Sequence, residues 1–133
     1  MTLDRSTITV LVVEDEVLPR LDLIDTLRST GQEVLEASNA DEALRYLHNG
    51  QRIDVVITDI RLGGGLTGWD VAEQFRAARS DIAIVYTSGR AVDRARMVSG
   101  SVFFGKPYRM ADITKACRAF DRTVRAEHRA TRT

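Results

Sequence analysis

The chain has 133 residues, of which 44% are hydrophobic and 29% are charged, a composition that is ordinary for a soluble globular domain. This length predicts one domain with a substantial core and leaves no room for a second, output domain such as a DNA-binding domain. Nineteen basic and nineteen acidic side chains cancel, which argues against a general nucleic-acid or membrane surface. The lack of an apolar run of transmembrane length and the single cysteine, Cys117, favour a reducing, cytoplasmic setting.

The first half of the sequence alternates between predicted strands and helices. Residues 8–13 are an apolar run typical of a buried strand, and apolar residues then recur at helical spacing as far as Gly31. Residues 33–37 predict a short second strand, and the helix after it has Asn39 as its N-cap and Glu42 as the capping-box partner. The apolar positions of these helices are Val17, Leu18, Leu21, Ile24 and Leu27 in the first and Ala43, Leu44 and Leu47 in the second.

The second half continues this alternation. Residues 53–58 predict a third strand, and a glycine-rich loop connects it to a third helix at 68–79. Residues 82–86 and 102–104 predict the last two strands, and the segment 90–99 between them has room for only a short helix. A last helix follows the fifth strand. The apolar residues expected on buried faces are Val71, Ala72, Phe75 and Ala78 in the third helix and Ile113, Cys117, Phe120 and Val124 in the last.

Five alternations of strand and helix predict an α/β fold with a parallel sheet covered on both faces. We expect a three-layer, doubly wound (βα)5 fold of the flavodoxin-like type, with five parallel strands in the order 2-1-3-4-5. The domain would span residues 7–121, after a flexible N-terminus at 1–6. We expect residues 122–133 to be a basic tail that extends the last helix, and its arginine stripe would be either a solvated face or a docking site for an acidic partner.

Polar side chains stand where four of the predicted strands end. Glu14 and Asp15 follow the first strand, and Asp59 ends the third. Strands one and three flank the topological switch point of a sheet with this order, so their acids should converge at the edge where such sheets bind ligands. The fourth and fifth strands would bring a hydroxyl group, that of Ser88, and an ammonium group, that of Lys106, to the same edge.

This ordered set of four motifs resembles the receiver domain of two-component response regulators, and the resemblance covers about residues 7–121. It implies that a histidine kinase or a histidine phosphotransfer protein transfers a phosphoryl group to Asp59, with Mg²⁺ as the cofactor. It also implies that Glu14, Asp15 and Asp59 hold the metal, together with the main-chain carbonyl of Arg61. Mg²⁺ prefers oxygen ligands, and clustered carboxylates repel one another unless a cation lies between them, so the chemistry agrees with these roles.

The same resemblance implies three switch residues. Ser88 would bond the phosphoryl group, Lys106 would pair with it, and Phe103 would occupy the aromatic switch position. Ser88 is preferred to Thr87 because a glycine follows it and leaves the phosphoryl group accessible, but the choice between the two hydroxyl groups stays open. The bond between Lys106 and Pro107 is a candidate cis peptide that would fix the turn carrying the lysine.

Three features depart from the usual pattern of these domains. Glu14 stands where an aspartate is more common, and the loop after Asp59 lacks the usual proline and carries three consecutive glycines. Ser88 and Lys106 are closer together in the sequence than in many such domains, so the fourth helix should be shortened. This shortening places the usual output surface in question.

The sequence therefore predicts a stand-alone receiver domain, monomeric or weakly dimeric, that acts through an unidentified downstream protein or as a phosphate shuttle or sink. It would not be an enzyme beyond intrinsic autophosphorylation from small phosphodonors and autodephosphorylation. One alternative is a Mg²⁺-dependent phosphohydrolase of the haloacid dehalogenase type, but those enzymes need a second aspartate where this chain has Arg61. Another is a degenerate receiver that serves as a scaffold, against which the intact Asp59, Ser88 and Lys106 argue.

Overall fold

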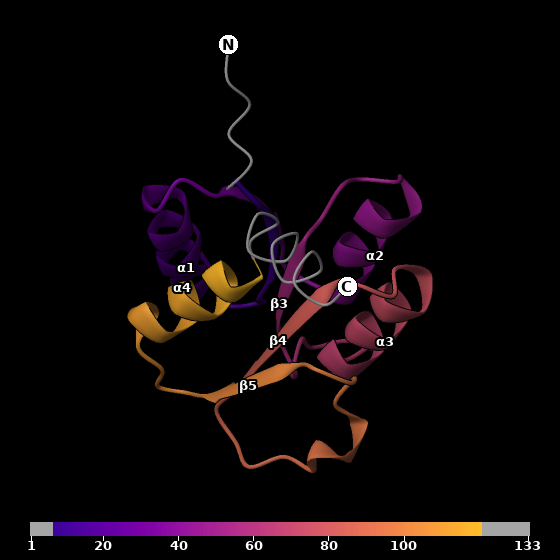
Figure 1. Ribbon diagram of the computed structural model, residues 1–133. Helices are drawn as coiled ribbons and strands as arrows, with labels where there is room; N and C mark the ends of the chain where they lie inside the picture. The colour runs from indigo at the N-terminus through magenta and orange to yellow at the C-terminus, as the bar shows by residue number, and fades with distance from the viewer. Residues whose placement is uncertain (1–6, 121–133) are drawn as a thin grey trace, which may run out of the picture.

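The computed structural model describes residues 7–120, which fold into a five-stranded parallel sheet with helices on both faces (Figure 1). The strands are β1 (Thr9–Val13), β2 (Glu33–Ala37), β3 (Val55–Asp59), β4 (Ala83–Ser88) and β5 (Val102–Gly105). The α-helices of this part are α1 (Val17–Ser29), α2 (Ala40–His48), α3 (Gly68–Ala78) and α4 (Met110–Ala119). The strand order β2-β1-β3-β4-β5 confirms the predicted doubly wound topology. The predicted flexible N-terminus, 1–6, and the basic tail, 122–133, lie outside the described residues.

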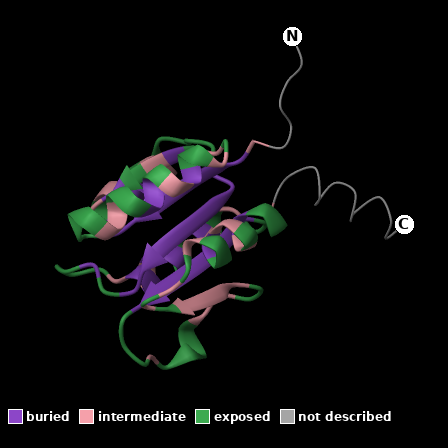
Figure 2. Ribbon diagram, turned by 90° about the vertical axis from the view of Figure 1, so that its left-hand side faces the viewer, coloured by how far each residue is buried: buried purple, intermediate pink, exposed green. Residues whose placement is uncertain are grey.

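The core consists of two apolar layers, one on each face of the sheet. β1, β3 and β4 are buried along their whole length (Figure 2), as the continuous apolar runs predicted. On one face, Ile24 and Leu27 of α1 pack with Ile113 of α4. On the other, Leu44 of α2 packs with Phe75 of α3. Among residues 7–120, no helix is long and apolar enough to cross a membrane.

The apolar stripe predicted for the first helix is only partly correct. Ile24 and Leu27 are buried, but Val17, Leu18 and Leu21 are 55%, 74% and 43% exposed. The buried side of α1 carries Leu23, Ile24 and Leu27, and at 3.6 residues per turn Leu18, nine residues before Leu27, lies on the opposite side of the helix. The predicted stripe missed Leu23 and joined residues that lie on different sides of the helix. The burial predicted for Ala78 in α3 is also wrong, because this residue ends its helix and is exposed.

The crossover between β4 and β5 is the main departure from a regular alternation of strands and helices. Residues 89–101, called here the β4–β5 segment, contain a single 3-10 turn at Arg94–Arg96 where a fifth α-helix would complete the pattern. Figure 1 shows this segment as a long loop below β5. The sequence prediction that this stretch has room for only a short helix is therefore confirmed.

Polar contacts hold the β4–β5 segment against α3. The guanidinium of Arg96 lies 3.1 Å from a carboxylate oxygen of Asp70 and 2.7 Å from one of Glu73. The main-chain N–H of Val98 donates a hydrogen bond of 3.1 Å to the hydroxyl oxygen of Tyr86, whose side chain comes from β4 and is fully buried. The segment thus takes its shape from bonds to its neighbours instead of from an internal helix.

The start of α3 lies against the end of β3, and one glycine makes this contact possible. Thr67 and Asp70 form a capping box that begins the helix. The main-chain N–H of Gly68 donates to the carbonyl oxygen of Ile60 at 2.8 Å. A Cβ atom at position 68 would overlap the carbonyl oxygen of Asp59. A side chain at this position would therefore push α3 away from the strand end that carries Asp59.

We predict that Gly68→Ala destabilises the fold by about 1–3 kcal/mol, the usual cost of forcing extra atoms into a packed site. Alanine is the better helix former by about 1 kcal/mol, so a loss of stability at this helical position would be attributable to the overlap. The measurement is the free energy of unfolding in urea.

Gly65→Ala is the matched control, because a Cβ atom there meets nothing within 4 Å and its φ is not positive. Equal free energies of unfolding for the two variants would show that the contact at Gly68 does not constrain the chain.

Candidate functional site

Three carboxylates converge at one edge of the sheet, as the strand order predicted. Glu14 and Asp15 follow β1, and Asp59 is the last residue of β3, the strand paired with β1. Each contributes one carboxylate oxygen to a group in which all these atoms lie within 4.8 Å of one another. Glu14 and Asp59 are buried, whereas Asp15 is exposed. Two of the acids therefore depend on partners within the protein, and the third faces solvent.

Lys106 joins the two buried acids. Its Nζ lies 2.7 Å from Oε1 of Glu14 and 2.6 Å from Oδ2 of Asp59. The main-chain N–H of Lys106 donates to the carbonyl oxygen of Ser88 at 2.7 Å, so the end of β4 fixes where the lysine leaves β5. The peptide bond between Lys106 and Pro107 is cis, as the sequence suggested. The ends of β1 and β3 thus meet at the Lys106 ammonium, and the end of β4 is bonded to the Lys106 main chain.

Burial shifts the pKa values of Glu14 and Lys106, and the hydrogen bonds within the cluster oppose these shifts. Burial raises the pKa of Glu14 to about 7, with a further rise from the negative charge of Asp59, although hydrogen bonds from Lys106 and the Glu16 N–H work against it. Partial burial of the ammonium acts to lower the pKa of Lys106, but its hydrogen bonds to Asp59 and Glu14 outweigh this and the pKa rises. Lys106 therefore stays charged at neutral pH, whereas the carboxyl group of Glu14 titrates near neutral pH.

The donor set fits a small, hard divalent cation. It consists of carboxylate oxygens, the ligands that Mg²⁺ prefers. Three carboxylates against one ammonium leave an excess of negative charge when all are ionised, which a cation would offset. The N–H of Arg61 donates to Oδ1 of Asp59 at 3.1 Å, so the Arg61 main chain lies beside the acid. That the carbonyl group of Arg61 is a metal ligand stays a prediction.

The two candidate hydroxyl groups lie at the end of β4 and are both buried. Thr87 lies opposite Asp59 in the register of β3 and β4, and Ser88 is the next residue. The Ser88 hydroxyl donates to the carbonyl oxygen of Arg90 at 3.1 Å and accepts from the Arg90 N–H at 3.2 Å. Ser88 is thus bonded to the beginning of the β4–β5 segment, and its contact with a phosphoryl group stays a prediction.

Phe103 and Phe104 point to opposite faces of the sheet. Phe103 packs with the α2–α3 side, where it lies opposite Tyr86 in β4, and Phe104 packs with the α1–α4 side. The guanidinium of Arg94 lies 4.4 Å from the centre of the Phe103 ring, within the range of a cation–π interaction. Phe103 therefore contacts the β4–β5 segment, as its predicted switch role requires, although that role itself stays a prediction.

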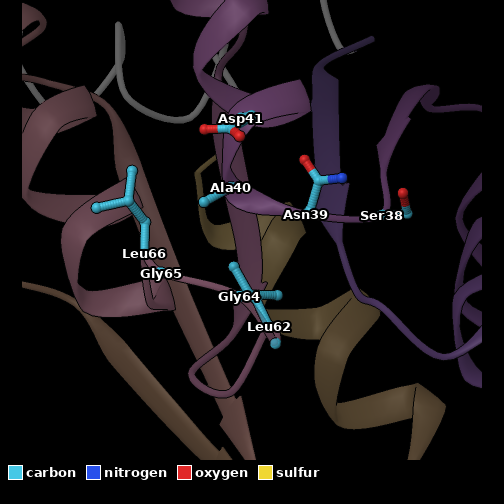
Figure 3. A pocket seen from close by; sticks show the side chains of 9 residues that line it. Ser38, Asn39, Ala40, Asp41, Leu62, Gly64, Gly65 and Leu66 are labelled. Carbon is cyan, nitrogen blue, oxygen red and sulfur yellow. The ribbon is translucent and has the colours of Figure 1, made fainter.

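An open groove lies beside the acid cluster, between the start of α2 and the loop after β3 (Figure 3). It has a volume of about 480 Å³. A Cβ atom at Gly63 in its wall would lie 3.7 Å from Oδ2 of Asp15, so the wall of the groove lies close to the exposed acid. Gly63 and Gly64 have φ angles of +65° and +76°, which other residues rarely adopt. The run of three glycines in the sequence indicated this unusual loop backbone. Nothing in the sequence indicated the close contact between Gly68 and Asp59, apart from a glycine at the start of a helix.

We predict that Glu14 makes metal-free stability depend on pH. Because its pKa is raised in the folded state from the usual 4.5 to about 7, its stabilising contribution is fully present below about pH 4.5 and is lost as the pH rises through about 7. At about 1.4 kcal/mol per pKa unit, the loss is on the order of 2–3 kcal/mol. Urea unfolding between pH 4.5 and 8 in the presence of a chelator measures it.

Glu14→Gln is the comparison, because it keeps the shape of the side chain without the titration. The difference in the free energy of unfolding between the two proteins should change through this window. Parallel pH profiles would show that Glu14 titrates normally. The contribution of Lys106 is lost only above its usual pKa of 10.5, so it does not enter this window.

Comparisons with known proteins agree with this geometry. A family model described as the response regulator receiver domain matches residues 10–118. The transcriptional regulatory protein PdtaR of Mycobacterium tuberculosis is 34% identical over 113 residues, which cover 80% of this chain and 53% of that protein. The sensor kinase CckA of Brucella abortus is 32% identical over 110 residues, which cover 79% of this chain and 12% of that protein. The chain thus spans about half the length of PdtaR and a small part of CckA.

Solved structures show the same fold. A response regulator receiver protein from Sinorhizobium medicae has a TM-score of 0.83 and 34% identity, with 86% of this chain and 94% of that chain covered. A CheY-like receiver domain protein from Methanospirillum hungatei has a TM-score of 0.80 at 21% identity, covers 92% of this chain and 99% of that chain, and supports the fold alone. This chain belongs to the family of response regulator receiver domains.

Proposed function

We propose that this receiver domain accepts a phosphoryl group on Asp59 from a histidine kinase or a histidine phosphotransfer protein, with Mg²⁺ as its cofactor. The observation that carries the proposal is the placement of the Asp59 carboxylate, which is buried at a strand end, 2.6 Å from the Lys106 ammonium and clustered with two more acids. Glu14, Asp15 and Asp59 would hold Mg²⁺, whose positive charge would offset the negative charge of the incoming phosphoryl group.

The chemistry at Asp59 is a phosphoryl transfer between two side chains. A carboxylate oxygen of Asp59 forms a bond to phosphorus while the bond between phosphorus and the donor imidazole nitrogen breaks, and the electron pair of that bond returns to the nitrogen. The product is an acyl phosphate on Asp59. Lys106 is already within hydrogen-bond distance of this carboxylate, so its ammonium is in place to pair with the added negative charge.

We further propose that the domain signals instead of turning over a substrate. Its own chemistry would be limited to autophosphorylation from small phosphodonors and autodephosphorylation, and it would act through a downstream protein or as a phosphate shuttle or sink. The Ser88 hydroxyl, now bonded to Arg90, supports a binding role, because drawing it toward a phosphoryl group would pull on the β4–β5 segment. A cytoplasmic setting and a monomeric or weakly dimeric state remain predictions.

The start of α1 carries exposed apolar residues beside the acid cluster. Val17, Leu18 and Leu21 are exposed apolar residues in the turns that directly follow Glu14 and Asp15. A donor histidine must come within bonding distance of Asp59, so the donor protein has to cover the surface around the acid cluster. Exposed apolar side chains beside such a site are typical of protein contacts. We propose that these three residues, called here the α1 patch, contact the donor protein.

The test of the proposed function is labelling with a small phosphodonor. Incubation with acetyl phosphate and Mg²⁺ should add one phosphoryl group, detected by intact mass and removed by hydroxylamine because an acyl phosphate reacts with it. Asp59→Asn should not be labelled, and Asp15→Ala should lose labelling with its metal ligand. Undiminished, Mg²⁺-independent labelling of Asp59→Asn would show that the phosphoacceptor lies elsewhere.

The α1 patch predicts a difference between protein and small-molecule donors. Leu18→Ser should weaken phosphotransfer from a kinase or phosphotransfer protein that labels the wild type by about tenfold, the effect of losing more than 1 kcal/mol at an interface. Labelling by acetyl phosphate should be unchanged, because Leu18 is not part of the acid cluster. Time courses of phosphotransfer, quenched at set intervals, measure both rates.

Leu66→Ser tests whether the effect is specific to the α1 patch, since Leu66 is another exposed large apolar residue near the acid cluster but lies in the loop before α3, on the wall of the groove. Transfer from the donor protein at the wild-type rate to Leu18→Ser would place the docking surface elsewhere.

A further inference from the structure

The Arg20 side chain projects from the first turns of α1 and is 13% exposed. Its Nη1 donates a hydrogen bond of 2.8 Å to the main-chain carbonyl oxygen of Glu14. Its Nε lies 3.4 Å from Oε1 of Glu36, close enough for an ion pair, but it has no hydrogen-bond partner among the described residues. The directed bond of this guanidinium therefore goes to the main chain beside the acid cluster.

The bonded carbonyl belongs to the peptide group that connects Glu14 to Asp15. A peptide group is planar, so holding its oxygen also orients the N–H and the Cα atom of Asp15. The other polar groups of Glu14 are bonded as well: its N–H donates to the carbonyl oxygen of Ala37 at 3.0 Å, and its carboxylate accepts from the N–H of Glu16 and from Lys106. Arg20 completes this set and is the contact that acts on both acids at once.

We propose that Arg20 is a positioning residue for the cation site. It fixes the peptide between Glu14 and Asp15 and thereby sets how the carboxylates of these two acids are placed relative to each other. The inference rests on the proposed function, because it concerns the binding of Mg²⁺ by these acids. Arg20 itself does not contact the reacting groups.

Positioning and simple charge predict opposite results when Arg20 is made neutral. A positive charge near three carboxylates opposes the entry of a cation, so its removal should strengthen cation binding if charge alone mattered. If Arg20 positions the acids, its removal should weaken binding. Mg²⁺ requires near-ideal octahedral geometry whereas Ca²⁺ tolerates irregular sites, so lost positioning should affect Mg²⁺ more than Ca²⁺.

The experiment is a calorimetric titration of the full chain with Mg²⁺ and, separately, with Ca²⁺. Arg20→Met should weaken Mg²⁺ binding by about 10-fold or more, the usual effect of losing an outer contact that orients a metal ligand. The loss for Ca²⁺ should be smaller. Arg20→Lys keeps a charged donor and should lie between Arg20→Met and the wild type.

Arg28→Met is the matched control. Arg28 belongs to the same helix and contacts a main-chain carbonyl oxygen, that of Val34 at 3.4 Å, but it stands two turns further from the acids. The substitution removes the same charge and should leave the Mg²⁺ affinity unchanged.

Mg²⁺ binding by Arg20→Met as tight as or tighter than that of the wild type would overturn the proposal, as would an equal loss for Mg²⁺ and Ca²⁺. Should Arg20→Met fail to fold, Arg20→Lys alone decides: a loss for Mg²⁺ that exceeds the loss for Ca²⁺ supports positioning, and wild-type affinity refutes it. A wild-type protein that binds no Mg²⁺ would refute the proposed function itself. A wild type that binds Mg²⁺ and an Arg20→Met that binds it equally would refute only the role of Arg20.

Discussion

The contact of one ammonium group with two buried carboxylates is the interaction on which this site depends. Lys106 follows β5, whereas Glu14 and Asp59 belong to the ends of β1 and β3, so the contact joins three strands that are far apart in the sequence. Buried carboxylates are costly unless they are paired with a charge or hydrogen-bonded. The apolar sheet creates that cost by excluding water from the strand ends. β5 places the Lys106 ammonium against both acids, and this pairing offsets the cost. Fold and site are therefore set by the same arrangement of strands.

The sequence predicted the strand ends well because buried parallel strands appear in it as continuous apolar runs. Once the order 2-1-3-4-5 is assumed, the residue after each run has only one edge of the sheet to occupy, and Glu14, Asp59 and Lys106 meet there. Features that depend on how two elements face each other were not predictable in this way. The side of α1 that faces the sheet carries Leu23, Ile24 and Leu27 and leaves Leu18 exposed, although all four residues are apolar. Gly68 is needed because two backbones come close, a condition that produces no repeating pattern.

The β4–β5 segment shows a second limit of sequence patterns. The short spacing between the fourth and fifth strands indicated that a full helix would not fit there. It did not indicate what replaces the helix, because the replacing contacts join the segment to residues elsewhere in the chain. Arg96 reaches Asp70 and Glu73 on α3, and the Val98 N–H reaches the Tyr86 hydroxyl on β4. Helix periodicity reports only contacts within a few residues, so these bonds had to come from the structure.

The free energies of these contacts are similar in size to the coupling free energy expected for the proposed signalling. Arg96 and its two acidic partners are partly exposed, and exposed ion pairs contribute about 0–1 kcal/mol each. Coupling between a local modification and a distant surface is typically about 1–3 kcal/mol. A full helix packed on the sheet would bury several apolar side chains, and its release would exceed that range. The β4–β5 segment packs three partly buried apolar residues, Val92, Met97 and Val98, against the core, and ion pairs and hydrogen bonds hold the rest of it. In the proposed function, a segment without a full helix therefore needs less energy to move when Ser88 responds to the charge added at Asp59.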